Sequence, residues 1–253
     1  MITRLVLSMF VLLAAWGSFR LLAADEGPAR QGQFVQYGQM HEAIGKQQHQ
    51  GRVHFGELTE RPHFYGVAAL QGLRGEATIL DGKITVTTVD AKGQTRPVRD
   101  NLGDLQATML VGGYVSAWSE HPVTKDVAPD DFDEFIETAA TQAGIGLKQP
   151  FVFTVAGKFE DVRLHVINGA CPLHARLMKK ELPKNLQPFE AELRTVEGTV
   201  VGVFAKDAVG KITHPATSTH IHLLFADPES GEQLTGHVEQ LGLQAGAVVR
   251  LPK

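Results

Sequence analysis

The sequence has a single cysteine, Cys171, among its 253 residues. One cysteine cannot form an internal disulfide, and it excludes a metal site built from several thiolates. A transition metal would therefore be bound by histidine and carboxylate side chains, and the 11 histidines are enough for such a site. Without disulfides the fold depends on its core, which a chain with 43% hydrophobic residues can build.

A strong charge of either sign is also lacking. The formal net charge is −4, and the acidic and basic residues are interspersed along the chain. Proteins that bind nucleic acid or anionic membranes usually carry a basic patch or a block of basic residues. We therefore expect no nucleic-acid partner.

Long apolar runs are absent except at the N-terminus. There LVLSMFVLLAAWGSF follows the basic start MITR and precedes RLLAAD. This order is typical of a secretory signal peptide, and the run is short for a membrane span. We predict a signal peptide over 1–24 and an exported, periplasmic or extracellular, mature chain without a stable membrane span. A retained N-terminal anchor is the alternative, because Arg20 interrupts the apolar region.

The remaining sequence is rich in β patterns. Apolar and polar residues alternate over 66–98, and Asp-Gly at 81–82 is typical of a hairpin turn. Further strands are predicted over 107–118, in two pieces around Gly157, and in the segments FEAELRTVEGTVVGVFA, THIHLLFA, TGHVEQLGL and VVRLP.

Helical patterns are few. Acidic residues followed by helically spaced apolar residues predict a helix over 130–144, and shorter helices are expected within 36–51 and 173–182. Because the elements do not alternate as βαβ units, we predict an α+β fold of two domains with mixed, largely antiparallel sheets. The predicted domains are an N-terminal mixed β domain, 25–170, and a C-terminal β domain, 171–253, that carries the metal-binding histidines.

Two histidines lie one residue apart in the apolar segment THIHLLF. Side chains alternate along a strand, so His220 and His222 project from the same face, roughly 7 Å apart by backbone rise. The segment FADPESGEQLTG contains turn-forming pairs and would fold back to place His237 beside them. Three histidines with an open position are typical of catalytic zinc, although the ligand type also allows iron, nickel, copper or manganese. The alternative is that the strand histidines face solvent and the third is incidental.

Other titratable residues complete the candidate site. Glu76 lies among apolar residues of the strongest β pattern, where a carboxylate is costly unless it is paired or functional. Arg163 and His165 share one strand face, either as a functional pair or as an ordinary sheet face. Glu239 is either a partner behind the metal ligands or an exposed carboxylate. His214 is assigned to a loop beside a proline.

With HIHLLF, TGHV, EGTVVG and GEATILDGK, the chain resembles the alpha-acetolactate decarboxylase family from about Gln36 to Leu251. The resemblance implies a two-domain fold of mixed sheets, a homodimer, and zinc held by three histidines. These ligands fall on the three histidines singled out above, His220, His222 and His237, and the family's catalytic glutamate falls on Glu76.

Three positions differ from the family pattern. His165 stands in place of an arginine, with Arg163 on the same face, Ala69 stands in place of a threonine, and a late C-terminal glutamate has no counterpart.

The resemblance implies a carboxy-lyase that converts 2-acetolactate to acetoin and CO2 through a metal-stabilised enediolate. Zn²⁺ would act as a Lewis acid, Glu76 would handle the proton, and Arg163 or His165 would neutralise the substrate carboxylate. The expected partner is a small hydroxy-keto acid. The differences at His165 and Ala69 leave two alternatives open: an exported metal- or ligand-binding homologue, or a lyase for a related 2-hydroxy-3-oxo acid.

Overall fold

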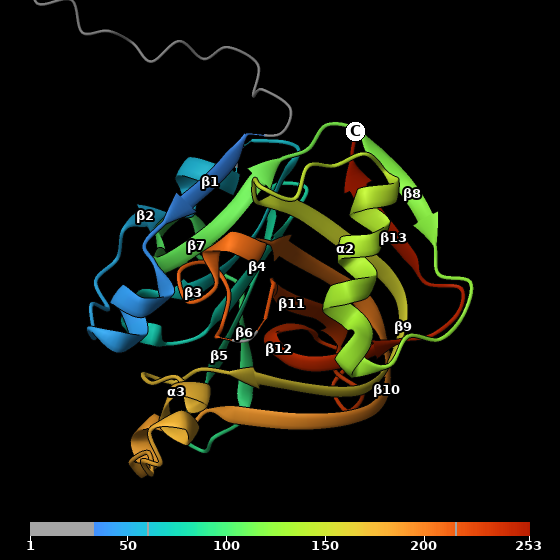
Figure 1. Cartoon of the computed structure of the whole chain (residues 1–253). Coiled ribbons are helices and arrows are strands. Elements are labelled where there is room, and N and C mark those ends of the chain that lie inside the picture. The colour runs from blue at the N-terminus through green and yellow to red at the C-terminus, as the bar shows by residue number, and fades with distance from the viewer. Residues whose placement is uncertain (1–32, 60, 216) are drawn as a thin grey trace, which may run out of the picture.

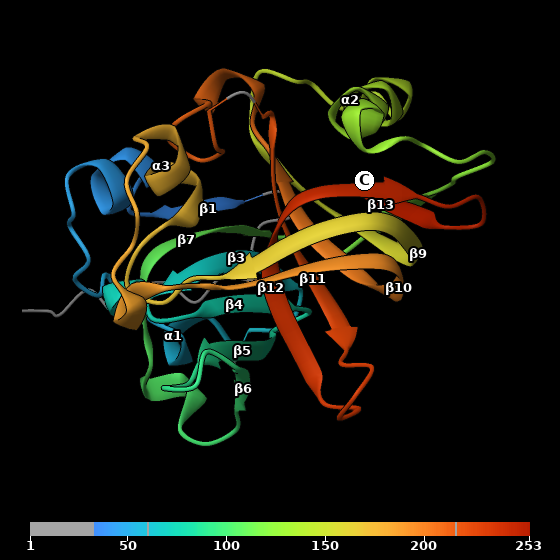
Figure 2. The ribbon, with the colours of Figure 1, turned by 90° about the horizontal axis from the view of Figure 1, so that it is seen from below.

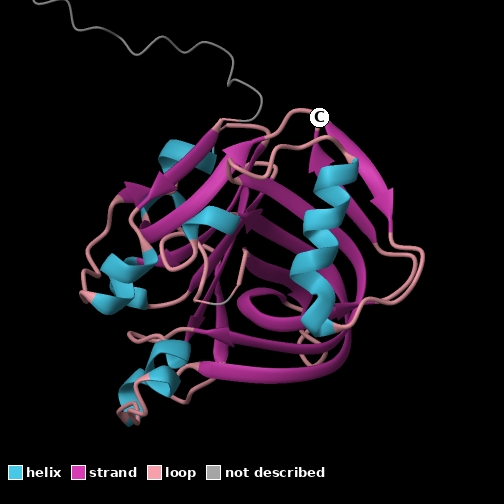
Figure 3. Ribbon diagram, in the orientation of Figure 1, coloured by secondary structure: helices cyan, strands magenta, loops and turns pink. Residues whose placement is uncertain are grey.

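Two antiparallel β-sheets build the fold in the computed structural model, which describes residues 33–59, 61–215 and 217–253 (Figure 1). The predicted signal peptide, 1–24, lies outside the described residues. Strands dominate and the helices are short (Figure 3). The predicted α+β class with largely antiparallel sheets is therefore confirmed.

The first sheet comes from the N-terminal part of the described chain. Its order is β1 (Phe34–Tyr37), β7 (Gln106–Tyr114), β3 (Phe64–Leu70), β4 (Glu76–Leu80), β5 (Lys83–Val89) and β6 (Thr95–Val98), and β2 (Val53–His54) also pairs with β7. The predicted hairpin at 81–82 is confirmed, because Leu80 pairs with Lys83. Both turn residues have positive φ, 52° at Asp81 and 75° at Gly82, which a type I′ turn requires.

The second sheet contains the remaining strands. Its order is β10 (Phe189–Phe204), β11 (Thr219–Ala226), β12 (Gln233–Leu243), β9 (Phe151–Val166), β13 (Val248–Pro252) and β8 (Trp118–Pro122). Because β9 also pairs with β10, the four strands β9 to β12 form a closed ring. Figure 2 shows this ring beside the first sheet.

Strand β9 differs from its prediction. It is one continuous strand of 16 residues, so the prediction of two strands around Gly157 was wrong. The pairing with β10 runs through Gly157, which lies opposite Gly198. At Gly157 a Cβ atom would lie 2.7 Å from the Cα atom of Ala247, so this glycine allows close backbone approach instead of ending the strand.

The helices lie outside the sheets. The predicted helix over 130–144 is confirmed as α2 (Phe132–Gln142), which packs Phe132 and Ile136 into the core of the second sheet. Two shorter helices are α1 (Gly56–Thr59) and α3 (Pro172–Leu177). Single helical turns occupy His41–Gly45, Gln71–Leu73, Leu102–Asp104, Pro129–Asp131, Lys184–Leu186 and Lys206–Ala208. Among the described helices, none is long and apolar enough to cross a membrane.

The two sheets pack against each other through β3, β4 and β5 on one side and β10, β11 and β12 on the other. The shared core includes Tyr65 and Val67 of the first sheet and Val201 and Leu224 of the second. The first sheet ends at Tyr114 and the second begins at Trp118, whereas the predicted domain boundary at 170/171 falls inside the second sheet. The division into domains at that position stays a prediction.

Candidate metal centre

Three buried histidines meet where β11 and β12 face the first sheet. His220 and His222 project from β11, and His237 lies directly opposite His222 on β12. One nitrogen atom from each imidazole lies within 4.8 Å of the corresponding atoms of the other two. The predicted hairpin therefore brings the three histidines together, and they are buried between the sheets instead of facing solvent.

The spacing of the three rings fits a metal ion. The ring centroids are 5.4 Å apart for His220 and His222, 5.0 Å for His220 and His237, and 5.5 Å for His222 and His237. Tetrahedral coordination with metal–nitrogen distances of about 2.0–2.1 Å places imidazole centroids roughly 5 Å apart. These residues could therefore hold a transition metal such as zinc in a tetrahedral site with one position left.

Two of the histidines are oriented by neighbours. The Nδ1 atom of His220 lies 2.9 Å from the carbonyl oxygen of Ile212, which accepts a hydrogen bond from it. The Nδ1 atom of His222 lies 3.3 Å from the hydroxyl of Thr78, which in turn lies 2.5 Å from the hydroxyl of Thr235. These contacts leave Nε2 of both rings for the metal, as partners behind metal ligands commonly do.

Burial keeps the three imidazoles neutral. It lowers the pKa of His220 to about 4, and it lowers the pKa values of His222 and His237 well below the usual range. Neighbouring imidazoles lower the pKa values of these two further, because a second positive charge would be repelled. Neutral imidazole is the form that binds metals, so the site is prepared for a cation at neutral pH.

Glu76 reaches the same site from the first sheet, at the start of β4. Its carboxyl oxygen Oε2 lies 3.6 Å from Nε2 of His222, and its side chain is buried. Burial raises the pKa of this carboxyl well above its usual value, and only a hydrogen bond from the backbone of Ile167 opposes that effect. A buried carboxyl that holds its proton can act as a general acid.

His165 and Arg163, the two residues predicted to neutralise the substrate carboxylate, lie in different surroundings. His165 on β9 lies opposite His237, with ring centroids 4.9 Å apart and the imidazole buried. Arg163 is half exposed, and its Nε atom lies 3.1 Å from the carboxylate of Glu239. Of the two, only His165 lines the small cavity beside the metal histidines, whereas Arg163 lines a wider cavity that also reaches His237.

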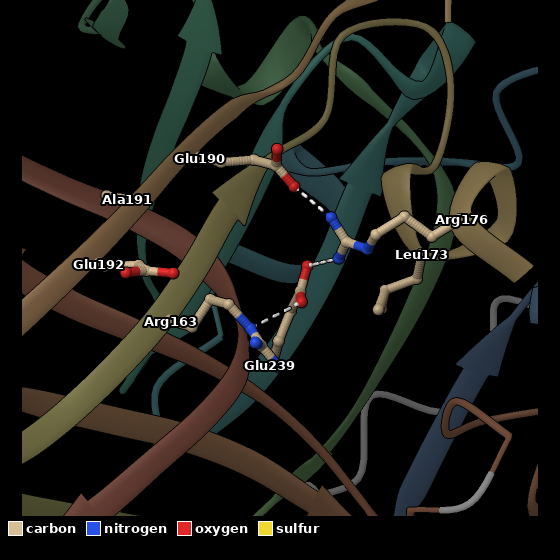
Figure 4. Close-up of a pocket in the computed structure, with 7 residues that line it drawn as sticks. All are labelled: Arg163, Leu173, Arg176, Glu190, Ala191, Glu192 and Glu239. Carbon is tan, nitrogen blue, oxygen red and sulfur yellow. Dashed lines mark hydrogen bonds and ion pairs between the residues drawn. The ribbon is translucent and has the colours of Figure 1, made fainter. Parts of the chain in front are cut away.

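Glu239 is not an exposed carboxylate, since its side chain is 4% exposed, and its partners are His165 and two arginines, none of them one of the three metal-site histidines. Its carboxylate accepts a hydrogen bond from Nδ1 of His165 at 2.8 Å. It also forms ion pairs with Arg163 and Arg176 (Figure 4). Burial alone would raise the pKa of Glu239, but the His165 hydrogen bond and the Arg176 charge lower it to about 2. Arg176 also pairs with Glu190, and this cavity of about 530 Å³ is lined by two arginines and three glutamates, the third being Glu192.

Sequence reasoning missed two residues near the site, Arg176 and His214. Arg176 lies on α3, and no spacing signal connects it with Glu239. His214 does lie in a loop, as predicted, but its ring centroid is 4.7 Å from that of His237 and 6.1 Å from that of His220. Burial, helped by the neighbouring His220, lowers the pKa of His214 to about 3.

Two cavities adjoin the histidines. A small cavity of about 30 Å³ is lined by Glu76, His165, His214 and two of the metal histidines, with apolar walls that include Met40, Ala69 and Met109. A wider cavity of about 390 Å³ also reaches His214 and His237, and it extends past Glu239 toward the start of α2. The smaller space holds only about two water molecules.

Comparison with known proteins decides the family. A family model described as alpha-acetolactate decarboxylase matches residues 35–250. The chain belongs to the alpha-acetolactate decarboxylase family. The predicted resemblance is therefore confirmed, and the family is one of carboxy-lyases. No curated protein matches the chain.

Solved structures show the same fold. An alpha-acetolactate decarboxylase from Bacillus subtilis strain 168 superposes with a TM-score of 0.64 at 17% identity, covering 87% of this chain and 85% of that chain. A Staphylococcus aureus protein of unknown function, described as similar to alpha-acetolactate decarboxylase, gives 0.62 at 19% identity with coverages of 87% and 85%. At these identities the likeness establishes the alpha-acetolactate decarboxylase fold, and the chemistry must be argued from this chain's own residues.

Two of the three differences from the alpha-acetolactate decarboxylase pattern fall on the cavity wall. His165 and Ala69, the positions at which the sequence resemblance led us to expect an arginine and a threonine, both line the small cavity. The differences therefore lie where a bound molecule would touch the protein, while the three metal-site histidines are kept.

Proposed function

We propose that this protein is a zinc-dependent carboxy-lyase that converts 2-acetolactate to acetoin and CO2. One observation carries the proposal: three buried imidazoles converge within 4.8 Å beside a buried carboxyl, Glu76, in a member of the alpha-acetolactate decarboxylase family. His220, His222 and His237 would hold the metal. When bound, zinc supplies a Lewis acid for the charge that develops on substrate oxygen as CO2 leaves.

Glu76 would supply the proton that the reaction needs. Loss of CO2 leaves an enediolate, and acetoin forms when the carbon that carried the carboxylate takes up one proton. Burial keeps Glu76 protonated, and its position 3.6 Å from His222 places that proton at the metal site. A proton from solvent then restores the carboxyl, so one proton is consumed for each CO2 released.

His165 would bind the departing carboxylate. Its Nδ1 atom is fixed by Glu239, so Nε2 of the same ring is the atom left for the small cavity that His165 lines. When protonated, the imidazole would neutralise the substrate carboxylate and steer it toward loss. Arg163 does not line that cavity and would act through Glu239, as a positioning residue.

We further propose that the chain is exported after removal of 1–24 and acts as a homodimer. The basic start and apolar run of the N-terminus support export. Sequencing the N-terminus of protein recovered outside the cytoplasm would test the cleavage, and sedimentation of the mature chain would test the dimer.

Two residues that line the small cavity support a second candidate function. His165 and Ala69 belong to the wall of this cavity, which has a volume of only about 30 Å³. A metal-binding protein without decarboxylase activity, or a lyase for a related 2-hydroxy-3-oxo acid, would keep the three histidines and alter this wall.

The test is CO2 release from racemic 2-acetolactate by purified protein of known zinc content, beside a His222→Ala control and an enzyme-free blank. Release above both controls supports the decarboxylase. Stoichiometric zinc without CO2 release from 2-acetolactate contradicts it and favours the second function.

A further inference from the structure

A fourth imidazole, that of His214, lies next to the three metal-site histidines. Its centroid distance of 4.7 Å to His237 is close to the distances of 5.0, 5.4 and 5.5 Å within the trio. The distance between the ring centroids of His214 and His220 is 6.1 Å, which is longer than all of these. Since tetrahedral coordination requires roughly 5 Å between every pair of centroids, a movement of the His214 ring toward His220 and His222 would bring it to the fourth position.

Hydrogen bonds hold the backbone around His214. The carbonyl of Ile212, two residues earlier, accepts the hydrogen bond of His220. The hydroxyl of Thr213 donates to the carbonyl of Thr217 at 2.7 Å, and the hydroxyl of Thr217 donates to the carbonyl of His214 at 3.2 Å. A shift of the ring therefore needs only rotation about side-chain bonds.

The ring nitrogens of His214 lack the partners that other histidines of the site have. Ile212 binds His220, Thr78 binds His222, and Glu239 binds His165. Among the residues that the structure describes, no hydrogen bond joins a ring nitrogen of His214. An imidazole in this position is available as a ligand.

His214 and His237 each line both cavities, the space of about 30 Å³ and the space of about 390 Å³. The smaller space is too small for even a small hydroxy-keto acid, since it holds about two water molecules. If the His214 ring rotated away from the trio, the volume it vacates would lie between the smaller space and the larger one, which His237 already lines.

We propose that His214 is a fourth, displaceable ligand of the metal ion, which occupies the open position until a ligand enters from the larger cavity. This inference rests on the proposed metal site. It adds a loop side chain to the three strand ligands. The strand histidines hold the metal permanently, and rotation of the loop histidine opens the position for substrate.

Cobalt-substituted protein tests the proposal through its visible absorption, which is intense for four-coordinate cobalt and weakens when water raises the coordination number. We expect the spectrum of a four-coordinate site in the wild-type protein and a weaker, shifted spectrum in His214→Ala. Added imidazole should restore the wild-type spectrum of the variant. His174→Ala is the matched control, because His174 is an exposed histidine on α3.

Metal affinity gives a second readout, by competition with a chromophoric chelator. Removing a residue that hydrogen-bonds to a metal ligand weakens metal binding about 10–100-fold. Loss of a direct ligand should therefore weaken metal binding by at least about tenfold. A His214→Ala protein with the wild-type cobalt spectrum and affinity would overturn the inference.

The two proposals fail in different ways. If wild-type protein binds no stoichiometric metal, the metal site itself is wrong. If it binds metal and His222→Ala does not, while His214→Ala matches the wild type, only the role of His214 is wrong. Circular dichroism and the thermal midpoint of each variant check that the chain is folded.

Discussion

Replacing Thr78 by valine is expected to weaken metal binding without removing any ligand. The Thr78 hydroxyl joins the two sheets, because it contacts His222 Nδ1 at 3.3 Å and the Thr235 hydroxyl at 2.5 Å. Valine has nearly the same shape but cannot form either hydrogen bond. His222 then loses one of the groups that orient its ring toward the metal, while the backbone of Ala77 remains.

Two magnitudes follow from these contacts. The variant leaves the Thr235 hydroxyl, which is fully buried, without this partner, and a buried polar group left unsatisfied costs about 1–3 kcal/mol of folding stability. Loss of a partner behind a metal ligand weakens metal binding about 10–100-fold. Zinc affinity is measured by chelator competition and stability by urea denaturation of the metal-free protein.

Thr108→Val is the matched control. Thr108 is also fully buried, and its hydroxyl donates to the carbonyl of His49 at 2.7 Å. Its neighbour Met109 lines the cavity, so Thr108 faces the opposite side of β7. The Thr108→Val variant should lose about as much folding stability as Thr78→Val and keep the wild-type zinc affinity. Thr78→Ser should retain most of the affinity. Equal zinc affinities for Thr78→Val and Thr108→Val would refute the reasoning.

Two further predictions concern the titratable groups. Glu76→Gln should keep stoichiometric zinc but lose most CO2 release, because the amide cannot donate the proton; unchanged turnover in a steady-state assay would remove Glu76 from the mechanism. The metal-free protein should lose stability as the pH falls below about 6.5, the unfolded histidine pKa, because burial lowers the folded pKa of His214 to about 3 and of His220 to about 4. The unfolded chain then binds more protons, and each histidine contributes a slope of up to about 1.4 kcal/mol per pH unit. Urea denaturation with chelator present, between pH 7.5 and 5, measures this slope; a flat profile would contradict it.

Local patterns predicted the strands and the histidine trio because both depend on neighbours in sequence. Alternation placed His220 and His222 on one face, and turn-forming residues in the following segment returned the chain so that His237 faces His222. The Asp-Gly turn at 81–82 was predictable for the same reason, since its conformation is set by two residues.

Other features depend on packing between distant segments and had no local signal. Glu76 and His222 belong to different sheets, so their contact follows from how the sheets pack. The ion pair between Arg176 and Glu239 and the approach of His214 follow from how two connections fold back over the ring of strands. At Gly157, pairing with β10 outweighed the local tendency of glycine to interrupt a strand.

Removal and return of the metal test the central claim most directly. Protein stripped with a chelator should release no CO2 from 2-acetolactate above the blank, and about one equivalent of zinc per chain, the capacity of a single three-histidine site, should restore release. His222→Ala treated in the same way should stay inactive. Undiminished CO2 release by the stripped protein, or full restoration in His222→Ala, would contradict a decarboxylase that works through this three-histidine site.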